Sequence, residues 1–203
     1  MALETTDLPP SPRSLIRNVP FIQNKKVYLG TVKAHLVFEK SEGLTSIQVP
    51  TADAAYTALR RKLRDGHRKG DVAAFKVAAD ELLRELSRFY RIRRPKLRLE
   101  GVRPHKLWEG TLAEQLDGLY EGDTITVWTR TAIHRRLVAF RTLMYTLVHE
   151  YCHHLDYEYL ELPRSFHTKG FFDRQHLLYR RIMRESWPGD WARAGNGGWC
   201  WRF

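Results

Sequence analysis

Residues 149–153 read His-Glu-Tyr-Cys-His, which places two imidazoles and a carboxylate within one helical turn. Residues four apart share a helix face, so His149 and His153 can direct ring nitrogens at a single ion. Glu150 is displaced sideways around the helix, where it is suited to contact a metal-bound water rather than to complete the ligand set. This H-E-x-x-H arrangement predicts a zinc site.

A catalytic zinc needs three protein ligands and an open position, so a third ligand must follow His153 in the chain. Asp156 shares the ligand face but is better suited to orient an imidazole than to bind the metal. His167 lies past the expected helix end, where the chain can turn back across the helix. Residue types alone leave the choice open among Asp156, Glu158, Glu161, His167, Asp173 and His176.

The chemistry expected of such a site is hydrolysis of a peptide bond. Zinc lowers the pKa of a bound water toward 7, and Glu150 takes the proton as general base and later returns it to the leaving amine. A second donor usually stabilises the oxyanion, and His176, Tyr179 and Arg174 are equal candidates. Together with Asp156, His176 and Tyr179 are the residues expected to support the ligands without binding zinc. His154 points about 100° away around the helix and is expected at the surface or behind a ligand.

Hydrophobic periodicity predicts the elements that carry these residues. A helix from about 134 to 159 should present the motif, and a further helix from 165 or 168 to about 185 should follow. A hairpin with arms at 118–120 and 124–129 precedes the first of these helices. An edge strand immediately before the zinc helix could hold a peptide by main-chain hydrogen bonds.

Upstream of the hairpin, two helices and a strand are expected within a main domain that spans residues 51–186. The first helix is expected to begin at Thr51, because Thr is a favoured N-cap residue, and the second is expected to begin near Asp71. A strand at 96–99 follows, where charged and apolar residues alternate.

The two ends of the chain are expected to lie outside that domain. Residues 1–50 are predicted to form an N-terminal arm and a small β appendage, with short strands between 26 and 38 and at 46–49. Residues 187–203 contain four of the six tryptophans, and such large apolar rings favour burial, so this tail is expected to pack on the domain.

The segment 167–171, His-Thr-Lys-Gly-Phe, follows the H-E-x-x-H motif after a short loop. The two motifs together resemble the SprT-like group of zinc metallopeptidases, within the zincin and gluzincin-like class. The resemblance covers about residues 70 to 185, although only the two motifs are specific. Thr168 stands where a Gly is common in that group, and the Cys-rich zinc ribbon that many relatives carry is absent.

The resemblance implies a ligand set, a fold and a class of substrate. The fold is α+β and zincin-like, with a small mixed sheet, an antiparallel edge strand by the cleft, an active-site helix and a C-terminal helix. The substrate is a protein or peptide, including proteins associated with nucleic acid. The implied site residues are the zinc ligands His149, His153 and His167 and the catalytic Glu150.

The chain of 203 residues is basic, with a net charge of +11 and a pI near 9.9. Residues 60–106 contain 16 Lys or Arg against 6 Asp or Glu, which favours DNA or RNA as a partner.

No apolar run reaches the length of a membrane span, and no secretory signal is evident, so a cytoplasmic protein is expected. Two alternatives to a peptidase remain: a nucleic-acid-associated binding protein with a structural zinc, and a zinc hydrolase acting on something other than protein. Oligomeric state is not indicated.

Overall fold

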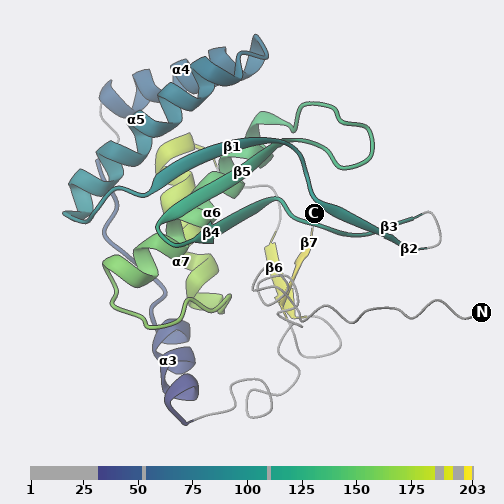
Figure 1. Cartoon of the computed structure of the whole chain (residues 1–203). Coiled ribbons are helices and arrows are strands. Elements are labelled where there is room, and N and C mark those ends of the chain that lie inside the picture. Colours follow the sequence, from purple (N-terminus) through teal and green to yellow (C-terminus); the bar gives the residue numbers. More distant parts are fainter. Residues whose placement is uncertain (1–31, 52–53, 109–110, 186–189, 194–198, 203) are drawn as a thin grey trace, which may run out of the picture.

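The computed structural model describes residues 32–51, 54–108, 111–185, 190–193 and 199–202. The fold is α+β, as predicted, with helices gathered around a small mixed sheet (Figure 1). None of the helices in these ranges is long and apolar enough to cross a bilayer. The elements in chain order are α3 Val32–Gly43, α4 Ala54–Arg68, α5 Val72–Tyr90, β1 Lys96–Val102, β2 His105–Trp108, β3 Thr111–Gln115, β4 Gly118–Glu121, β5 Thr124–Arg130, α6 Phe140–Glu158, α7 Lys169–Met183, β6 Asp190–Arg193 and β7 Trp199–Arg202.

The central sheet has three strands in the order β1-β5-β4. β1 pairs with β5 in parallel, and β4 pairs with β5 in antiparallel register. Along β5, Ile125, Val127 and Thr129 are buried while the residues between them are half-buried, which is the period-two pattern of a strand packed on one side. The predicted hairpin is confirmed, but its second arm is the central strand. The edge strand beside α6 is therefore the first arm, β4.

Helix α6 is almost entirely enclosed, because it lies between the sheet and the other helices (Figure 1). It begins at Phe140 rather than near residue 134. Arg135 adopts a left-handed backbone with φ of 51°, which a right-handed helix cannot contain. Leu137 then forms an isolated bridge with Arg130 and so extends the sheet. These two local structures account for the later start.

The N-terminal β appendage is wrong wherever the structure tests it. Residues 32–43 form helix α3, and residues 46–49 form no strand. Ala34, Phe38 and Ser41 are the buried residues of α3, and their spacing of four and three places them on one helix face. The hydrophobic pattern of this segment is too short to distinguish a helix from a strand. The packing of the buried face against the rest of the protein favours the helix. The rest of the predicted arm and appendage lies outside the described residues.

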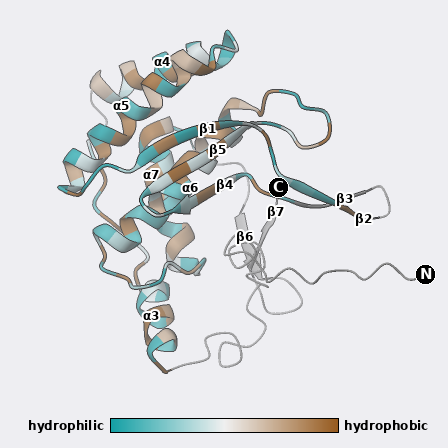
Figure 2. Ribbon diagram, in the orientation of Figure 1, coloured by the Kyte–Doolittle hydropathy of each residue, from teal (hydrophilic) through white to brown (hydrophobic). Residues whose placement is uncertain are grey.

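Helices α4 and α5 form a hairpin that packs beside β1 (Figure 1). Helix α5 begins near Asp71, as predicted; Asp71 is its N-cap, and the Asp71 side chain accepts from the Ala74 N–H at 2.9 Å. Gly66 lies against this cap, where an added Cβ would be 2.8 Å from the Phe75 nitrogen. In Figure 2, α3, α4 and α5 alternate between hydrophilic and hydrophobic residues, as amphipathic helices that bury one face do.

Two further hairpins were not expected from the sequence. β2 and β3 pair in antiparallel register with an irregularity between Lys106 and Leu107, and they project away from the helices (Figure 1). β6 and β7 pair within the Trp-rich tail. The predicted packing of that tail depends on side chains that lie outside the described part of the chain.

Candidate metal centre

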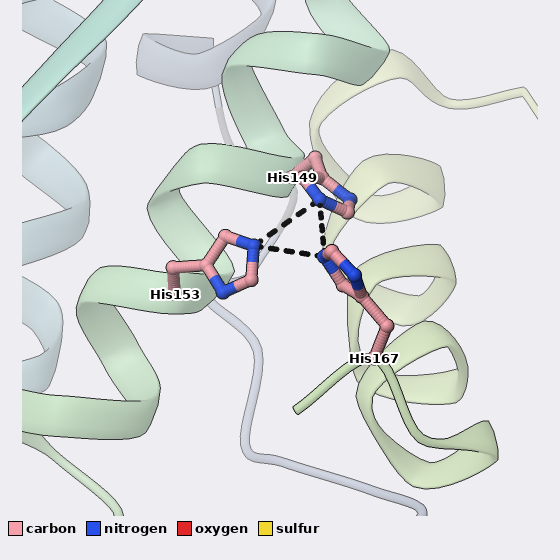
Figure 3. Close-up of side chains that lie close together, drawn as sticks. All are labelled: His149, His153 and His167. Carbon is pink, nitrogen blue, oxygen red and sulfur yellow. Dashed lines mark hydrogen bonds between the residues drawn. The ribbon is translucent and has the colours of Figure 1, made fainter. Parts of the chain in front are cut away.

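Three histidine side chains converge between α6 and the loop that precedes α7 (Figure 3). The Nε2 atoms of His149 and His167 lie 2.9 Å apart, those of His149 and His153 lie 3.2 Å apart, and those of His153 and His167 lie 3.0 Å apart. His153 is buried and the other two rings are half-buried. Three ring nitrogens therefore face one point.

Hydrogen bonds on the far side of two rings select the tautomer that binds metals. The Nδ1 atom of His149 lies 3.0 Å from Gln175 Oε1, and the amide of Gln175 is oriented by donation from its nitrogen to the Tyr145 carbonyl. An amide oxygen only accepts, so His149 Nδ1 carries the proton. Ser165 donates to Asp156 at 2.7 Å, and its oxygen therefore accepts from His153 Nδ1, also at 2.7 Å. Both Nε2 atoms then direct lone pairs at the shared point.

This donor set fits a divalent metal such as zinc. Tetrahedral coordination with a Zn–N distance of about 2.05 Å places ligand nitrogens about 3.3 Å apart, so a shift of about 0.2 Å per ring would produce it. Burial lowers the pKa of His149 to about 4 and that of His167 to about 3, and burial with the neighbouring imidazoles holds the pKa of His153 well below its usual range. The three rings are neutral at pH 7, as ligands must be.

An aromatic side chain supports all three imidazoles. Phe171 is fully buried, and its ring centroid lies 5.0 Å from that of His149, 4.7 Å from that of His153 and 5.2 Å from that of His167. Its position is fixed because Thr168 caps α7 and accepts from the Phe171 N–H at 3.0 Å. The spacing between His167 and Phe171 thus has a structural reason: one turn of a capped helix brings the ring beneath the ligands.

Glu150 belongs to no ligand group and lies against the edge strand. Its carboxylate lies beside the backbone of Tyr120 in β4, and only 5 % of the residue is exposed. Gly118 makes this approach feasible, because an added Cβ would be 2.8 Å from Glu150 Cγ and closer still to Oε1. Burial, followed by the negative charge of Asp117, raises the pKa of Glu150 to about 8. A nearby divalent cation would oppose this shift.

The residues expected to support the site occupy different positions. Asp156 contacts His153 through Ser165, which agrees with the expected orienting role. The His176 Nε2 atom lies 3.1 Å from the Tyr145 hydroxyl, and the Tyr179 ring packs edge-on against Tyr145 at 5.5 Å. His176 and Tyr179 thus line the α6–α7 contact one helical turn before His149.

Two other residues named from the sequence are enclosed in the structure. Arg174 is 1 % exposed and donates to Asp156 at 2.8 Å, so its guanidinium is directed into the protein rather than at a substrate. His154 is fully buried, with Nε2 2.7 Å from the Arg93 carbonyl and Nδ1 3.0 Å from the Tyr120 hydroxyl. A surface position for His154 is therefore wrong.

The metal-ligand candidates are now reduced to one set. Within the described residues, the group of side chains able to hold an ion consists of His149, His153 and His167. Gln175 was missed by sequence reasoning, because nothing local indicates that a glutamine on α7 returns to His149. Ser165 was considered only as the start of the helix that follows the zinc helix.

No family model, curated protein or solved structure matches the chain. The resemblance to the SprT-like group thus rests on the two motifs, whose residues the structure brings together around one point.

Proposed function

We propose that the protein is a zinc metallopeptidase of the SprT-like type, with a zincin-like active site. The observation that supports this most directly is the convergence of three Nε2 atoms, two of them held in the metal-binding tautomer, while the residue next to His149 on α6 carries the buried carboxylate of Glu150. Three imidazoles with one position left open are typical of catalytic zinc, whereas structural zinc usually has four protein ligands. Within the described residues, no fourth ligand joins this group.

Bound at these nitrogens, zinc would supply Lewis acidity and a water of lowered pKa. The protein's part is to orient the ligands and to move protons. Gln175 and Ser165 hold two rings in place. Glu150 takes a proton from the attacking water and returns it to the leaving amine, and burial suits its carboxylate to hold that proton near neutral pH.

A peptide is favoured over other hydrolysable substrates because of β4. This strand is an edge of the central sheet, and the Glu150 carboxylate lies beside its backbone at Tyr120. An extended peptide added along β4 would pass beside the carboxylate and the three imidazoles. A small-molecule substrate would not need a strand edge, so cleavage of unfolded protein but not of small esters or amides would distinguish the two.

Zinc titration of the purified chain of 203 residues tests the proposal. The wild type should bind one zinc and hydrolyse labelled casein, and His167→Ala should weaken zinc binding at least about 100-fold. His134→Ala is the matched control, because His134 is exposed and lies outside the ligand group. Equal zinc affinity in wild type and His167→Ala would exclude this site.

Nucleic-acid binding is the second candidate, because the basic excess at residues 60–106 extends over α4, α5 and β1. Part of this charge is paired locally, for example Lys62 with Glu81 at 2.9 Å and Lys76 with Asp80 at 2.6 Å. Retention on DNA that falls steeply between 50 and 200 mM salt, the interval over which phosphate contacts lose about 1,000-fold or more in affinity, would support this function. Weak retention that does not change with salt would argue against it.

A further inference from the structure

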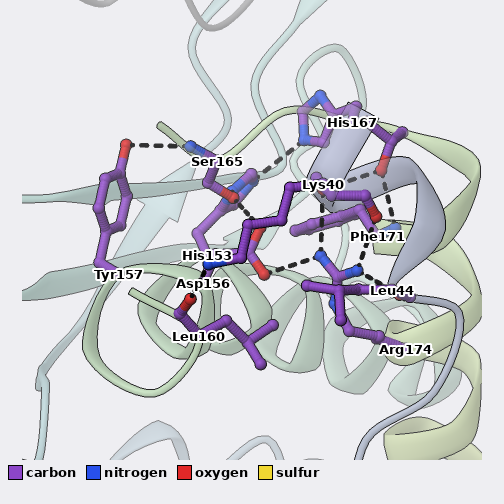
Figure 4. Close-up of polar contacts among 12 residues, drawn as sticks. Lys40, Leu44, His153, Asp156, Tyr157, Leu160, Ser165, His167, Phe171 and Arg174 are labelled. Carbon is purple, nitrogen blue, oxygen red and sulfur yellow. Dashed lines mark hydrogen bonds and ion pairs between the residues drawn. The ribbon is translucent and has the colours of Figure 1, made fainter. Parts of the chain in front are cut away.

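Helix α3 lies against the metal-ligand loop, which we define as residues 160–168 (Figure 4). At the start of the loop, Lys40 donates its ammonium to the Leu160 carbonyl at 3.3 Å. Further along, the Phe38 ring packs on Phe166 at 5.9 Å, in a small apolar cluster separate from the main core. Helix α3 thus contacts the loop on both sides of its middle.

The contact continues at the residues that follow His167. The hydroxyls of Ser41 and Thr168 are 3.0 Å apart and both residues are fully buried. The Lys169 N–H donates to the Glu42 carboxylate at 2.8 Å. The residue directly after His167 and the first residue of α7 therefore both bind the last turn of α3.

Gly170 allows the two backbones to meet. A Cβ at Gly170 would lie 2.7 Å from the Glu42 carbonyl oxygen and 2.9 Å from that of Leu44, and closer still to that of Ser41. Carbon–oxygen contacts this short are repulsive, and all three neighbours are backbone atoms that cannot rotate away. Any side chain at this position would push α3 off α7.

Arg174 joins α3 to α6. Its guanidinium donates to the carbonyl oxygens of Ser41 and Leu44 at the C-terminal end of α3, where unpaired carbonyls need donors. It also donates to Asp156 on α6 at 2.8 Å, and the two side chains are 2 % and 0 % exposed. Burial raises the pKa of Asp156, and the Arg174 cation opposes that shift. Removing either side chain would leave the other charge buried without a partner.

Asp156 is connected to the metal-ligand candidate His153 through Ser165. It accepts from Ser165 Oγ, which in turn accepts from His153 Nδ1, and both distances are 2.7 Å. The chain of bonds from α3 to His153 therefore runs through Arg174, Asp156 and Ser165 (Figure 4).

We propose that α3 and Arg174 position the metal centre: α3 holds the loop that carries His167, and Arg174 orients His153 through Asp156 and Ser165. The inference rests on the proposed zinc site and assigns zinc affinity in part to a helix that contributes no ligand. Outer partners of metal ligands commonly change metal affinity about 10- to 100-fold.

Gly170→Ala tests whether the contact between α3 and α7 supports zinc binding, because alanine favours helix α7 and yet displaces α3. The zinc dissociation constant, measured by chelator competition, should rise at least about 10-fold. Gly43→Ala is the matched control, because Gly43 lies in α3 with nothing within 4 Å of an added Cβ, and its affinity should equal that of wild type.

Phe38→Ala is the second variant, because Phe38 lies outside the main core and its truncation should loosen α3 without unfolding the domain. It should weaken zinc binding in the same direction, and Phe38→Leu should restore most of the affinity. With Co²⁺ as the probe, both weakened variants should show an altered visible absorption spectrum, which reports ligand geometry and which a purely stabilising helix would leave unchanged.

The outcomes separate this inference from the proposed function. A wild type that binds no zinc refutes the metal site itself. If the wild type binds zinc and the folded Gly170→Ala or Phe38→Ala variants have unchanged affinity and Co²⁺ spectrum, the positioning role of α3 is refuted. The metal site itself would then still stand. If Gly170→Ala does not fold, Phe38→Ala decides.

Discussion

The Gly118→Ala variant tests the role of the Glu150 carboxylate separately from that of the metal ligands. Gly118 lies in edge strand β4 against α6, and a Cβ there would be 2.6 Å from Thr146 Cγ2 and 2.8 Å from Glu150 Cγ. Non-bonded carbons prefer about 3.5 Å or more, so either the Glu150 side chain or β4 must move by about 0.7–0.9 Å. Overpacking of this kind typically costs about 1–3 kcal/mol of stability.

The displacement should lower the hydrolytic rate far more than it lowers stability. A misplacement of about 1 Å at a reacting group can reduce a rate about 100-fold. Zinc affinity should be unchanged, because Glu150 is not part of the ligand group. The assay is kcat/KM for labelled casein, measured on wild type and variant loaded to equal zinc content and checked for folding by urea denaturation.

Gly101→Ala in β1 is the control, because an added Cβ there meets nothing within 4 Å. It should retain wild-type activity and zinc content. A Gly118→Ala protein that is folded, zinc-loaded and fully active would refute the assignment of Glu150 as general base in this position.

Three further predictions concern the metal-free protein. Folded His149 resists protonation to about pH 4 while the unfolded chain takes the proton near 6.5, and the lowered pKa values of His153 and His167 act in the same direction. In the Glu150→Gln variant, which lacks the opposing titration of Glu150, stability should therefore fall by at least about 3 kcal/mol as pH falls from 7 to 4; a level urea midpoint of this variant over the interval would contradict it. The raised pKa of Glu150 acts in the opposite sense, costing stability as pH rises from 4.5 through 8, so Glu150→Gln should stabilise the protein by about 2–4 kcal/mol at pH 8; unchanged stability would contradict this. Tyr120→Phe removes the hydroxyl partner of buried His154 and should cost about 1–2 kcal/mol, whereas Tyr159→Phe at an exposed site should cost little; equal losses in both would contradict the hydrogen bond.

The residues closest to the chemistry were the easiest to predict, because their geometry is local. A spacing of four on a helix places His149 and His153 together whatever surrounds them. His167 was reached only through resemblance, since a loop can return in many ways. Glu150 was expected to face a water near the metal, and its contact with Tyr120 could not be anticipated because it depends on which hairpin arm is the edge.

The supporting contacts could not be predicted because they join distant segments. A lone arginine such as Arg174 is usually solvated, and nothing in its neighbourhood indicates a buried partner on α6 or carbonyls on α3. Helix α3 itself was mistaken for strands, because its few apolar residues do not by themselves show a helical period. Their common helix face becomes evident only in the packing against α7. Both failures have one cause: long-range packing outweighs short local patterns.

Glu150→Gln tests the central claim most directly. The variant keeps the three imidazoles and the volume of the side chain but cannot accept a proton from water. Zinc content and casein hydrolysis should be measured on the same preparation. We predict one bound zinc, as in wild type, and hydrolysis reduced at least about 100-fold. One bound zinc with full hydrolysis would contradict the account.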